Sequence, residues 1–357
     1  MTAPPGRAAP PLRSAVVGCG AIAYEHLPFL ASSPQSKLVG VCDRSAALAD
    51  AARDRFHAEA AFTDFDAMLA EARPDIVHVL TPPQTHDALV RAALGAGAHV
   101  ICEKPMTGTA AETEGLLQCA ARAGRTLTES RNLLFNDPVI ELLRLIRDGR
   151  LGDVIECDIL LTVDFLSGPF GDRNLSGPAV QLPGGAIHDF LPHLVYAFQA
   201  LTGVSDVEEV HGVLQNRSQN PRAVFDFLDA LLYAGSVRGR LRIASDVQPA
   251  SFTATVRGSR ATVETDFYLP GLLVHGPPNV GKRSPLGQIA NGRRLIRAGF
   301  ANFRDKVMQY GPMHGMTRML DATYSAIRRG GPMPITPEQM IATARLTDRL
   351  IALGCQR

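Results

Sequence analysis

Two charged residues, Glu103 and Lys104, directly follow an apolar run that ends at Cys102. The run, residues 98–102, is typical of a buried parallel strand, and Pro105 ends it. In an open α/β sheet, ligands bind outside the carboxyl ends of the strands, so we expect both side chains at a binding cleft. A lysine there can act as a hydrogen-bond donor or an acid/base group, although the pair could equally do no more than solvate the strand end.

A second candidate lies far along the chain, where two glycines at 184–185 precede an expected helix. Asp189 and His193 stand four residues apart and would share one helix face. Because Pro192 would break a helix interior, we expect the pair in the first turn. A histidine oriented by an acid accepts a proton well near neutral pH, whereas the alternative is a capped helix with a solvent-facing ion pair. The adjacent His188 is a second candidate base or substrate contact.

A glycine motif follows the short apolar strand that ends at Val17, and it reads Gly18-Cys19-Gly20-Ala21-Ile22-Ala23. The glycines permit a tight turn and a close approach of the backbone to a ligand. The helix that follows would offer free N–H groups and its positive dipole end to a diphosphate. The alternative is a tight turn without a ligand, and the residues of the next strand favour the nucleotide site.

That next strand, residues 37–42, ends in Asp43, 23 residues after Gly20. This is the distance at which an acid meets the adenosine ribose hydroxyls of a dinucleotide. A carboxylate there repels a 2′-phosphate and favours NAD. Arg44 beside it could instead hold that phosphate, so NADP stays open, or it could stack on adenine or lie in solvent.

The Thr81-Pro82 turn leaves the end of another apolar strand, residues 75–80, which it cannot continue. We expect this turn to fold over the cofactor. His86 comes in the following turn, where it either contacts the cofactor or simply begins a helix that runs to about Leu94.

Strands alternate with helices up to residue 130, which predicts an N-terminal Rossmann domain over residues 14–130 with a doubly wound parallel sheet. Residues 1–13 read as a loose tail. Beyond residue 150, strands follow one another with few helices, which predicts an α+β domain over 131–357 with a mostly antiparallel sheet. Closing helices at 337–352 could pack back on the first domain.

The composition is that of an ordinary globular protein. The chain has 357 residues, of which 46% are hydrophobic and 20% charged, and its formal net charge is +1. That balance gives no bulk attraction for nucleic acid. Six scattered cysteines without metal-type spacing indicate free thiols in a reducing compartment: Cys19, Cys42, Cys102, Cys119, Cys157 and Cys355. With neither a signal-peptide pattern nor an apolar run of membrane-spanning length, we expect a cytoplasmic protein without a metal.

As a set, these motifs resemble the Gfo/Idh/MocA oxidoreductases, which include glucose–fructose oxidoreductase and inositol dehydrogenase. The resemblance covers about residues 14–275 and the C-terminal helix. It implies an NAD-dependent dehydrogenase that passes a hydride between a secondary hydroxyl of a sugar, cyclitol or sugar conjugate and the nicotinamide. It also implies a homodimer or homotetramer formed through the second sheet.

Carried over by position, the resemblance gives Lys104 the role of polarising the substrate hydroxyl and His193 that of the general base. Asp189 would hydrogen-bond the substrate or set the histidine. Two other classes would fit the same fold: a glycosidase that uses bound NAD for a transient oxidation, and a non-catalytic NAD-sensing regulator. The intact lysine, aspartate and histidine argue against the regulator.

The sequence departs from the family pattern at several positions. Pro183 replaces the first of three glycines, and Tyr196 stands where the family often has an aspartate. After the strand at 126–130, we expect Arg131 or Asn132 to line the substrate side.

The largest departure is a basic insert at 276–312, which has a single acid, Asp305, against a set of basic residues: Lys282, Arg283, Arg293, Arg294, Arg297, Arg304 and Lys306. Apolar residues recur at helical spacing between 286 and 308, which predicts an amphipathic helix. The simpler interpretation is that its apolar face packs on a neighbouring subunit. The other is a peripheral contact with a membrane surface or an anionic ligand.

Overall fold

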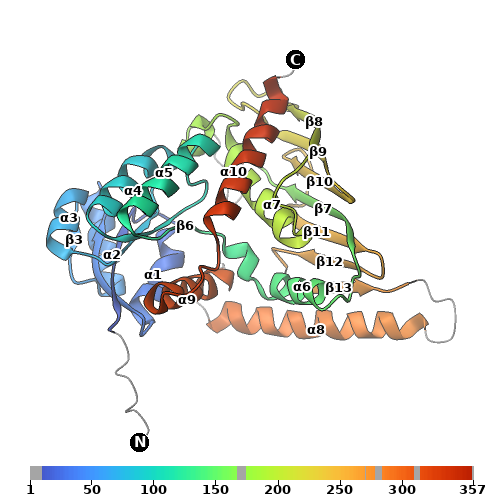
Figure 1. Ribbon diagram of the computed structural model, residues 1–357, viewed down its shortest axis with the longest axis horizontal. Coiled ribbons are helices and arrows are strands. Elements are labelled where there is room, and N and C mark those ends of the chain that lie inside the picture. Colours follow the sequence, from blue (N-terminus) through green and yellow to red (C-terminus); the bar gives the residue numbers. More distant parts are fainter. Residues whose placement is uncertain (1–9, 167–173, 270, 278–283, 309–313, 356–357) are drawn as a thin grey trace, which may run out of the picture.

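The computed structural model describes residues 10–166, 174–269, 271–277, 284–308 and 314–355. It contains two sheets side by side, each covered by helices (Figure 1). The first has six parallel strands in the order β3-β2-β1-β4-β5-β6, and the second has seven strands in the order β13-β12-β11-β7-β10-β9-β8. The predicted fold class is therefore confirmed.

The first sheet and its helices follow the expected alternation. The strands are β1 (Leu12–Val17), β2 (Ser36–Cys42), β3 (Ala61–Phe62), β4 (Ile76–Val79), β5 (His99–Cys102) and β6 (Leu127–Glu129). The helices are α1 (Ala23–Ser32), α2 (Ala46–Phe56), α3 (Phe65–Ala72), α4 (His86–Gly95) and α5 (Ala110–Ala123). Side chains of Ser45, Asp64 and Thr109 cap the first turns of α2, α3 and α5. The sequence missed β3, which is only two residues long, and β1 begins two residues before the expected start.

The second sheet is mixed rather than purely antiparallel, because β7 and β10 pair in parallel while the other neighbours are antiparallel. Its strands are β7 (Val154–Thr162), β8 (Glu209–Gln215), β9 (Phe227–Ala234), β10 (Val237–Ala244), β11 (Ser251–Gly258), β12 (Thr262–Asp266) and β13 (Gly271–His275). Helices α6 (Asp137–Arg147) and α7 (Ala186–Thr202) cover one face. Short 3₁₀ turns occur at Pro83–Thr85, Asn132–Phe135, Pro178–Gln181 and Leu353–Cys355.

Helix α7 corrects one expectation about the site. It runs without a break through Pro192, which is buried inside it, so Asp189 lies in the first turn but His193 lies beyond it. Local sequence predicts a break because proline removes one intrahelical hydrogen bond. Burial of the helix outweighs that loss, since ten of its residues are buried, among them Leu191, Leu194 and Phe198.

The C-terminal helices α9 (His314–Arg329) and α10 (Pro337–Ala352) return to the first domain (Figure 1). Tyr324 of α9 is fully buried in the core of the first sheet. On α10, Asp348 accepts a hydrogen bond from Ala110 N at the start of α5, while Thr343 donates one to Gln199 of α7. The two helices thus tie together the two sheets that form the site.

Helix α8 (Ser284–Met308) is the amphipathic helix expected from the insert, and it runs along one edge of the molecule beside β13 (Figure 1). Lys282 and Arg283 lie outside the described residues. Within the described part of the chain, no helix combines the length and apolar character needed to cross a membrane.

Candidate active site

Lys104 and Asp189 join the two domains. The Lys104 Nζ atom lies 3.0 Å from both the backbone oxygen and the Oδ1 atom of Asp189. Their side chains are 15% and 27% exposed, so the pair is partly shielded yet still open to a ligand. An ammonium group has three hydrogens to donate, and this geometry uses two of them. One N–H of Lys104 therefore remains for a substrate oxygen.

His193 lies one turn further along α7, and its partner is not the one expected. Its Nδ1 atom is 2.6 Å from the hydroxyl oxygen of Tyr196, whereas the carboxylate of Asp189 bonds Lys104. The expectation that Asp189 orients the histidine is thus corrected. Spacing could have suggested Tyr196, because a residue three positions after a histidine shares its helix face.

Burial and the nearby positive charge of Lys104 hold the pKa of His193 well below its ordinary value. The imidazole is therefore neutral near pH 7. Burial also raises the pKa of Tyr196 well above its ordinary value, so its hydroxyl stays protonated. A neutral histidine with one nitrogen bound to a phenol has its other nitrogen available for proton exchange.

Arg131 packs against Tyr196 and so supports the His193–Tyr196 pair, instead of lining the substrate side. Its guanidinium carbon lies 5.4 Å from the centre of the Tyr196 ring, and its Nε atom pairs with Glu129 Oε2 at 2.9 Å. Arg131 is only 2% exposed, and Asn132 is likewise buried. The structure therefore corrects the expectation of a direct substrate contact from Arg131 and gives Asn132 no open surface for one.

Glu103 turns into the protein core, away from the cleft in which we expected it. It is 7% exposed, and its Oε1 atom lies 3.1 Å from His26 Nε2. Burial alone would raise the pKa of Glu103, but the hydrogen bond and charge of His26, a bond to Ser130 and the charge of Lys104 lower it overall. Its other oxygen accepts the backbone N–H of Lys104 at 3.3 Å. Glu103 thus fixes the strand end that carries the lysine.

The glycine motif forms the tight turn that its sequence predicts. Gly18 has a φ of +94°, and a Cβ atom there would meet the Leu80 carbonyl at 2.8 Å and the Thr81 side chain at 2.9 Å. A Cβ at Gly20 would meet nothing within 4 Å, so the backbone is open to a ligand there. Ala21 is exposed and Ile22 half-buried where α1 begins. Only glycine allows this loop to approach the Thr81-Pro82 turn so closely.

Asp43 lies next to this loop at the end of β2. Its Oδ2 atom accepts the backbone N–H of Cys19 at 2.8 Å, and Oδ1 accepts that of Ser45 at 2.9 Å. The carboxylate is half-buried and keeps acceptor capacity for the hydroxyls of a ribose. Arg44 is exposed beside it. These residues fit the adenosine end of a dinucleotide.

His86 clamps two loops together. Its Nε2 atom lies 2.7 Å from the Thr81 oxygen, and its Nδ1 atom lies 3.1 Å from the oxygens of both Pro105 and Met106. The ring is fully buried, and burial lowers its pKa. Of the two roles that the sequence allows His86, these bonds favour a support for the Thr81 and Lys104 loops over a contact with the cofactor. Gln84 extends the first loop to the second domain by donating to Pro178 O at 2.7 Å.

His188 lies against α10, although it immediately precedes Asp189. Together with Pro192 it lines a small cavity against Thr343 and Thr347 of α10. It is 2% exposed, and burial lowers its pKa to about 4. This placement corrects the expectation that His188 is a substrate contact or an alternative base.

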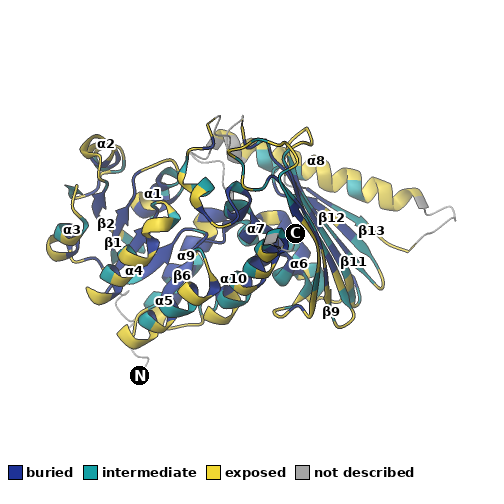
Figure 2. Cartoon of the chain, turned by 90° about the horizontal axis from the view of Figure 1, so that it is seen from above, coloured by how far each residue is buried: buried dark blue, intermediate teal, exposed yellow. Residues whose placement is uncertain are grey.

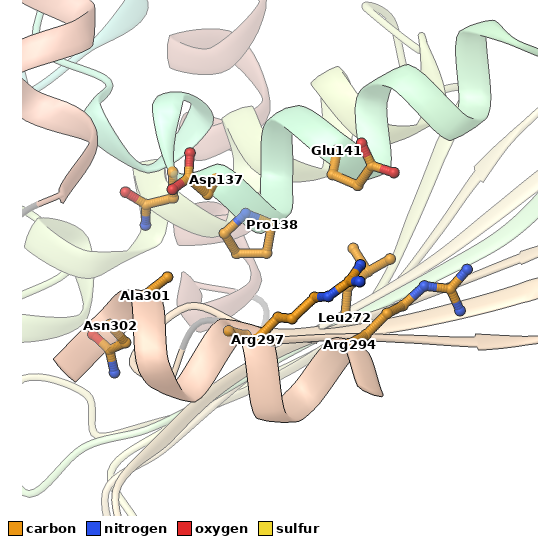
Figure 3. Close-up of a pocket in the computed structure, with 11 residues that line it drawn as sticks. Asp137, Pro138, Glu141, Leu272, Arg294, Arg297, Ala301 and Asn302 are labelled. Atoms are coloured by element: carbon orange, nitrogen blue, oxygen red, sulfur yellow. The ribbon is translucent and has the colours of Figure 1, made fainter. Parts of the chain in front are cut away.

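Among the described residues, no group of three or more His, Cys, Asp or Glu side chains is arranged to hold a metal ion. A cavity of about 370 Å³ lies between the start of α6, β13 and α8, where Arg294 and Arg297 extend toward α6 (Figure 3). Its lining includes neither Lys104 nor His193.

A glycine turn and an acid at the ends of parallel strands, faced by a lysine and a histidine, define a two-domain nucleotide-dependent oxidoreductase architecture. Two family models match the chain. The oxidoreductase family with an NAD-binding Rossmann fold matches residues 12–130, and the GFO/IDH/MocA C-terminal domain matches residues 139–264. Together they cover more than half of the chain, which therefore belongs to the Gfo/Idh/MocA oxidoreductase family.

Several relatives have been named for sugar chemistry. The chain is 36% identical to a dTDP-3,4-didehydro-2,6-dideoxy-alpha-D-glucose 3-reductase of Streptomyces violaceoruber over 144 residues, 40% of this chain and 42% of that protein. It is 28% identical to the D-glucoside 3-dehydrogenase of Escherichia coli over 209 residues, 56% and 57% of the two chains. These matches thus span about half of each relative's length. The WlbA dehydrogenase of Bordetella pertussis, solved with NADH and UDP-GlcNAcA, shares the fold with a TM-score of 0.77 at 19% identity, covering 97% of this chain and 96% of that one.

Proposed function

We propose that the protein is an NAD-dependent dehydrogenase that acts on a secondary hydroxyl of a sugar, cyclitol or sugar conjugate. The observation that carries this proposal is the arrangement of two neighbouring side-chain pairs where the two domains meet. Lys104 bonds Asp189 across the domain boundary, and His193 bonds Tyr196 close enough to Lys104 for the lysine's charge to lower the histidine's pKa. The named relatives that act on sugars support the substrate class.

Each pair has its own task in the proposed reaction. The free N–H of Lys104 binds the substrate oxygen and stabilises the negative charge that develops there as its proton leaves. His193 takes that proton at Nε2, which requires that Nδ1 carries a hydrogen and donates it to the Tyr196 oxygen. Asp189 fixes the position of the lysine, and Arg131 fixes that of the tyrosine.

The nucleotide end of the site fits NAD by the same reasoning. When bound, the nicotinamide accepts the hydride from the substrate carbon. The open backbone at Gly20 and the start of α1 would hold the diphosphate, and Asp43 would accept the ribose hydroxyls. Thr81 and Pro82 close the loop beside Gly18, where they would cover the cofactor. An exposed Arg44 leaves room for NADP at lower affinity.

We also propose a cytoplasmic homodimer or homotetramer. The second sheet leaves Leu231 and Tyr233 of β9 exposed, which supports a contact between copies through that sheet. Of the described cysteines, Cys19, Cys42, Cys102, Cys119 and Cys157 are free thiols, which supports a reducing compartment.

A screen of sugars, cyclitols and nucleotide-linked sugars for NADH formation tests the activity. We expect absorbance at 340 nm to rise with at least one of them, and Lys104→Ala to lower kcat by roughly 10²- to 10⁴-fold while NAD still binds. If a glycoside is cleaved without net NADH, the transient-oxidation glycosidase is correct instead. If NAD binds but neither reaction occurs with any member of these classes, the dehydrogenase proposal is wrong.

A further inference from the structure

Helix α8 presents an apolar stripe to solvent. Six of its large apolar residues are between 52% and 73% exposed, and they follow one another at alternating intervals of three, four or seven: Leu286, Ile289, Ile296, Phe300, Phe303 and Val307. Figure 2 shows α8 as a long, mostly exposed helix at one side of the molecule. A stripe of this size is unusual on a free protein surface and indicates a binding partner.

The opposite face of α8 holds the helix against the protein. The side-chain amide of Asn291 makes two hydrogen bonds of 3.0 Å to the backbone N and O atoms of Val274 in β13, as a neighbouring strand would. Leu295 lies against Gly271 of the same strand. Further along, the cavity beneath the helix separates it from α6 (Figure 3). Because this contact anchors one face, the stripe on the other side is directed outward.

Arginines follow one edge of the stripe. At 100° per residue, Arg304 falls beside Phe300 on the helix surface, and Arg293 falls within the stripe itself. Both are exposed. In a helix pair made by two copies, these positions would face each other across or beside the seam, where like charges oppose association. The charge pattern thus disfavours a second α8 and matches an anionic surface.

We propose that α8 binds the surface of an anionic membrane, with Phe300 and Phe303 inserted among the acyl chains and the arginines at the headgroups. Arginine suits this position, because its aliphatic stem can lie along apolar surface while its charge reaches the phosphates. The Asn291 anchor on β13 fixes the body of the protein, and with it the cleft, relative to that surface. The structure thus favours the membrane over the neighbouring subunit that the sequence alone made the simpler interpretation.

Flotation with vesicles tests this proposal on the full chain, and it needs no substrate. We expect wild-type protein to float at low salt with phosphatidylglycerol-containing vesicles, to float poorly with pure phosphatidylcholine, and to detach as salt rises. Phe300→Ser with Phe303→Ser should weaken the binding by about 100-fold or more. Arg293→Gln with Arg304→Gln should weaken it by roughly 30-fold.

Matched changes elsewhere provide the controls. Leu48→Ser with Val247→Ser removes two exposed apolar side chains away from α8, and Arg122→Gln with Arg260→Gln removes two charges. Both control variants should float like the wild type. Wild-type protein that stays unbound at low salt would overturn the proposal. So would vesicle binding that stays at the wild-type level in all four variants. If the phenylalanine variant instead reduces the mass in sedimentation while wild type does not float, a second copy covers the stripe.

Discussion

The cofactor side and the substrate side of the candidate site are built in different ways. On the cofactor side, the backbone sets the geometry: Gly18 packs against Leu80 and Thr81, and Asp43 binds the amide of Cys19. On the substrate side, side chains set it, because Lys104 bonds Asp189 and His193 bonds Tyr196. A change on the cofactor side should therefore mainly affect nucleotide affinity, whereas a change on the substrate side should mainly affect turnover.

Two histidines of α7 give the largest expected contrast. His193→Ala removes the proposed base and should lower kcat by roughly 10²- to 10⁴-fold, with partial recovery at high pH where solvent can accept the proton. His188→Ala changes a residue that faces α10 and should leave kcat within a few-fold of wild type. Steady-state rates with saturating NAD measure both. A large loss of kcat in His188→Ala, together with an unchanged kcat in His193→Ala, would show that His188 is the base.

The cofactor side was the more predictable one for a physical reason. The motif Gly18 to Ile22 and the distance to Asp43 are short-range features of strands and turns, and each strand end has a fixed place in a parallel sheet. The sequence therefore placed Gly18, Asp43 and Thr81 at the carboxyl edge of the first sheet, where the structure has them.

The substrate side depended on contacts that the spacing of residues does not determine. Asp189 and His193 share a helix, but Asp189 bonds Lys104, which lies 85 residues earlier in the chain, just after β5. Arg131 looked available at a strand end, and only tertiary packing shows it beneath Tyr196. The same applies to Glu103, which is turned inward by His26. Long-range pairing of this kind needs the fold before the site can be assigned.

A change at Asp43, on the cofactor side, should affect nucleotide affinity. If its carboxylate accepts the ribose hydroxyls, Asp43→Ala should weaken NAD by about 1.5 to 3 kcal/mol, or roughly 10- to 150-fold in Kd, with little change in kcat at saturation. NADP should lose less, since a repelling charge is gone. Isothermal titration calorimetry with NAD and with NADP measures this. A wild-type preference for NADP would contradict the assignment.

The most specific claim is that His193 bonds Tyr196 and not Asp189. Loss of this bond should produce the smallest effect. Tyr196→Phe removes the Nδ1 partner and should lower kcat/KM by about 2- to 10-fold, the range for one hydrogen bond. A phenol that accepts from Nδ1 stabilises the imidazolium as well, so without it the pKa of His193 should fall further. Asp189→Asn removes the negative charge that pairs with Lys104, and it should slow the reaction without moving the pKa of His193.

The pH dependence of kcat/KM for oxidation, measured in wild type, Tyr196→Phe and Asp189→Asn, tests this pairing most directly. Activity needs neutral His193, so it is lost as pH falls through the histidine's pKa. Because burial and Lys104 lower that pKa, the wild-type acid limb should lie below pH 6.5. We predict that this limb moves to lower pH in Tyr196→Phe and stays in place in Asp189→Asn. A limb that moves in Asp189→Asn but not in Tyr196→Phe would show that the aspartate, not the tyrosine, sets the histidine.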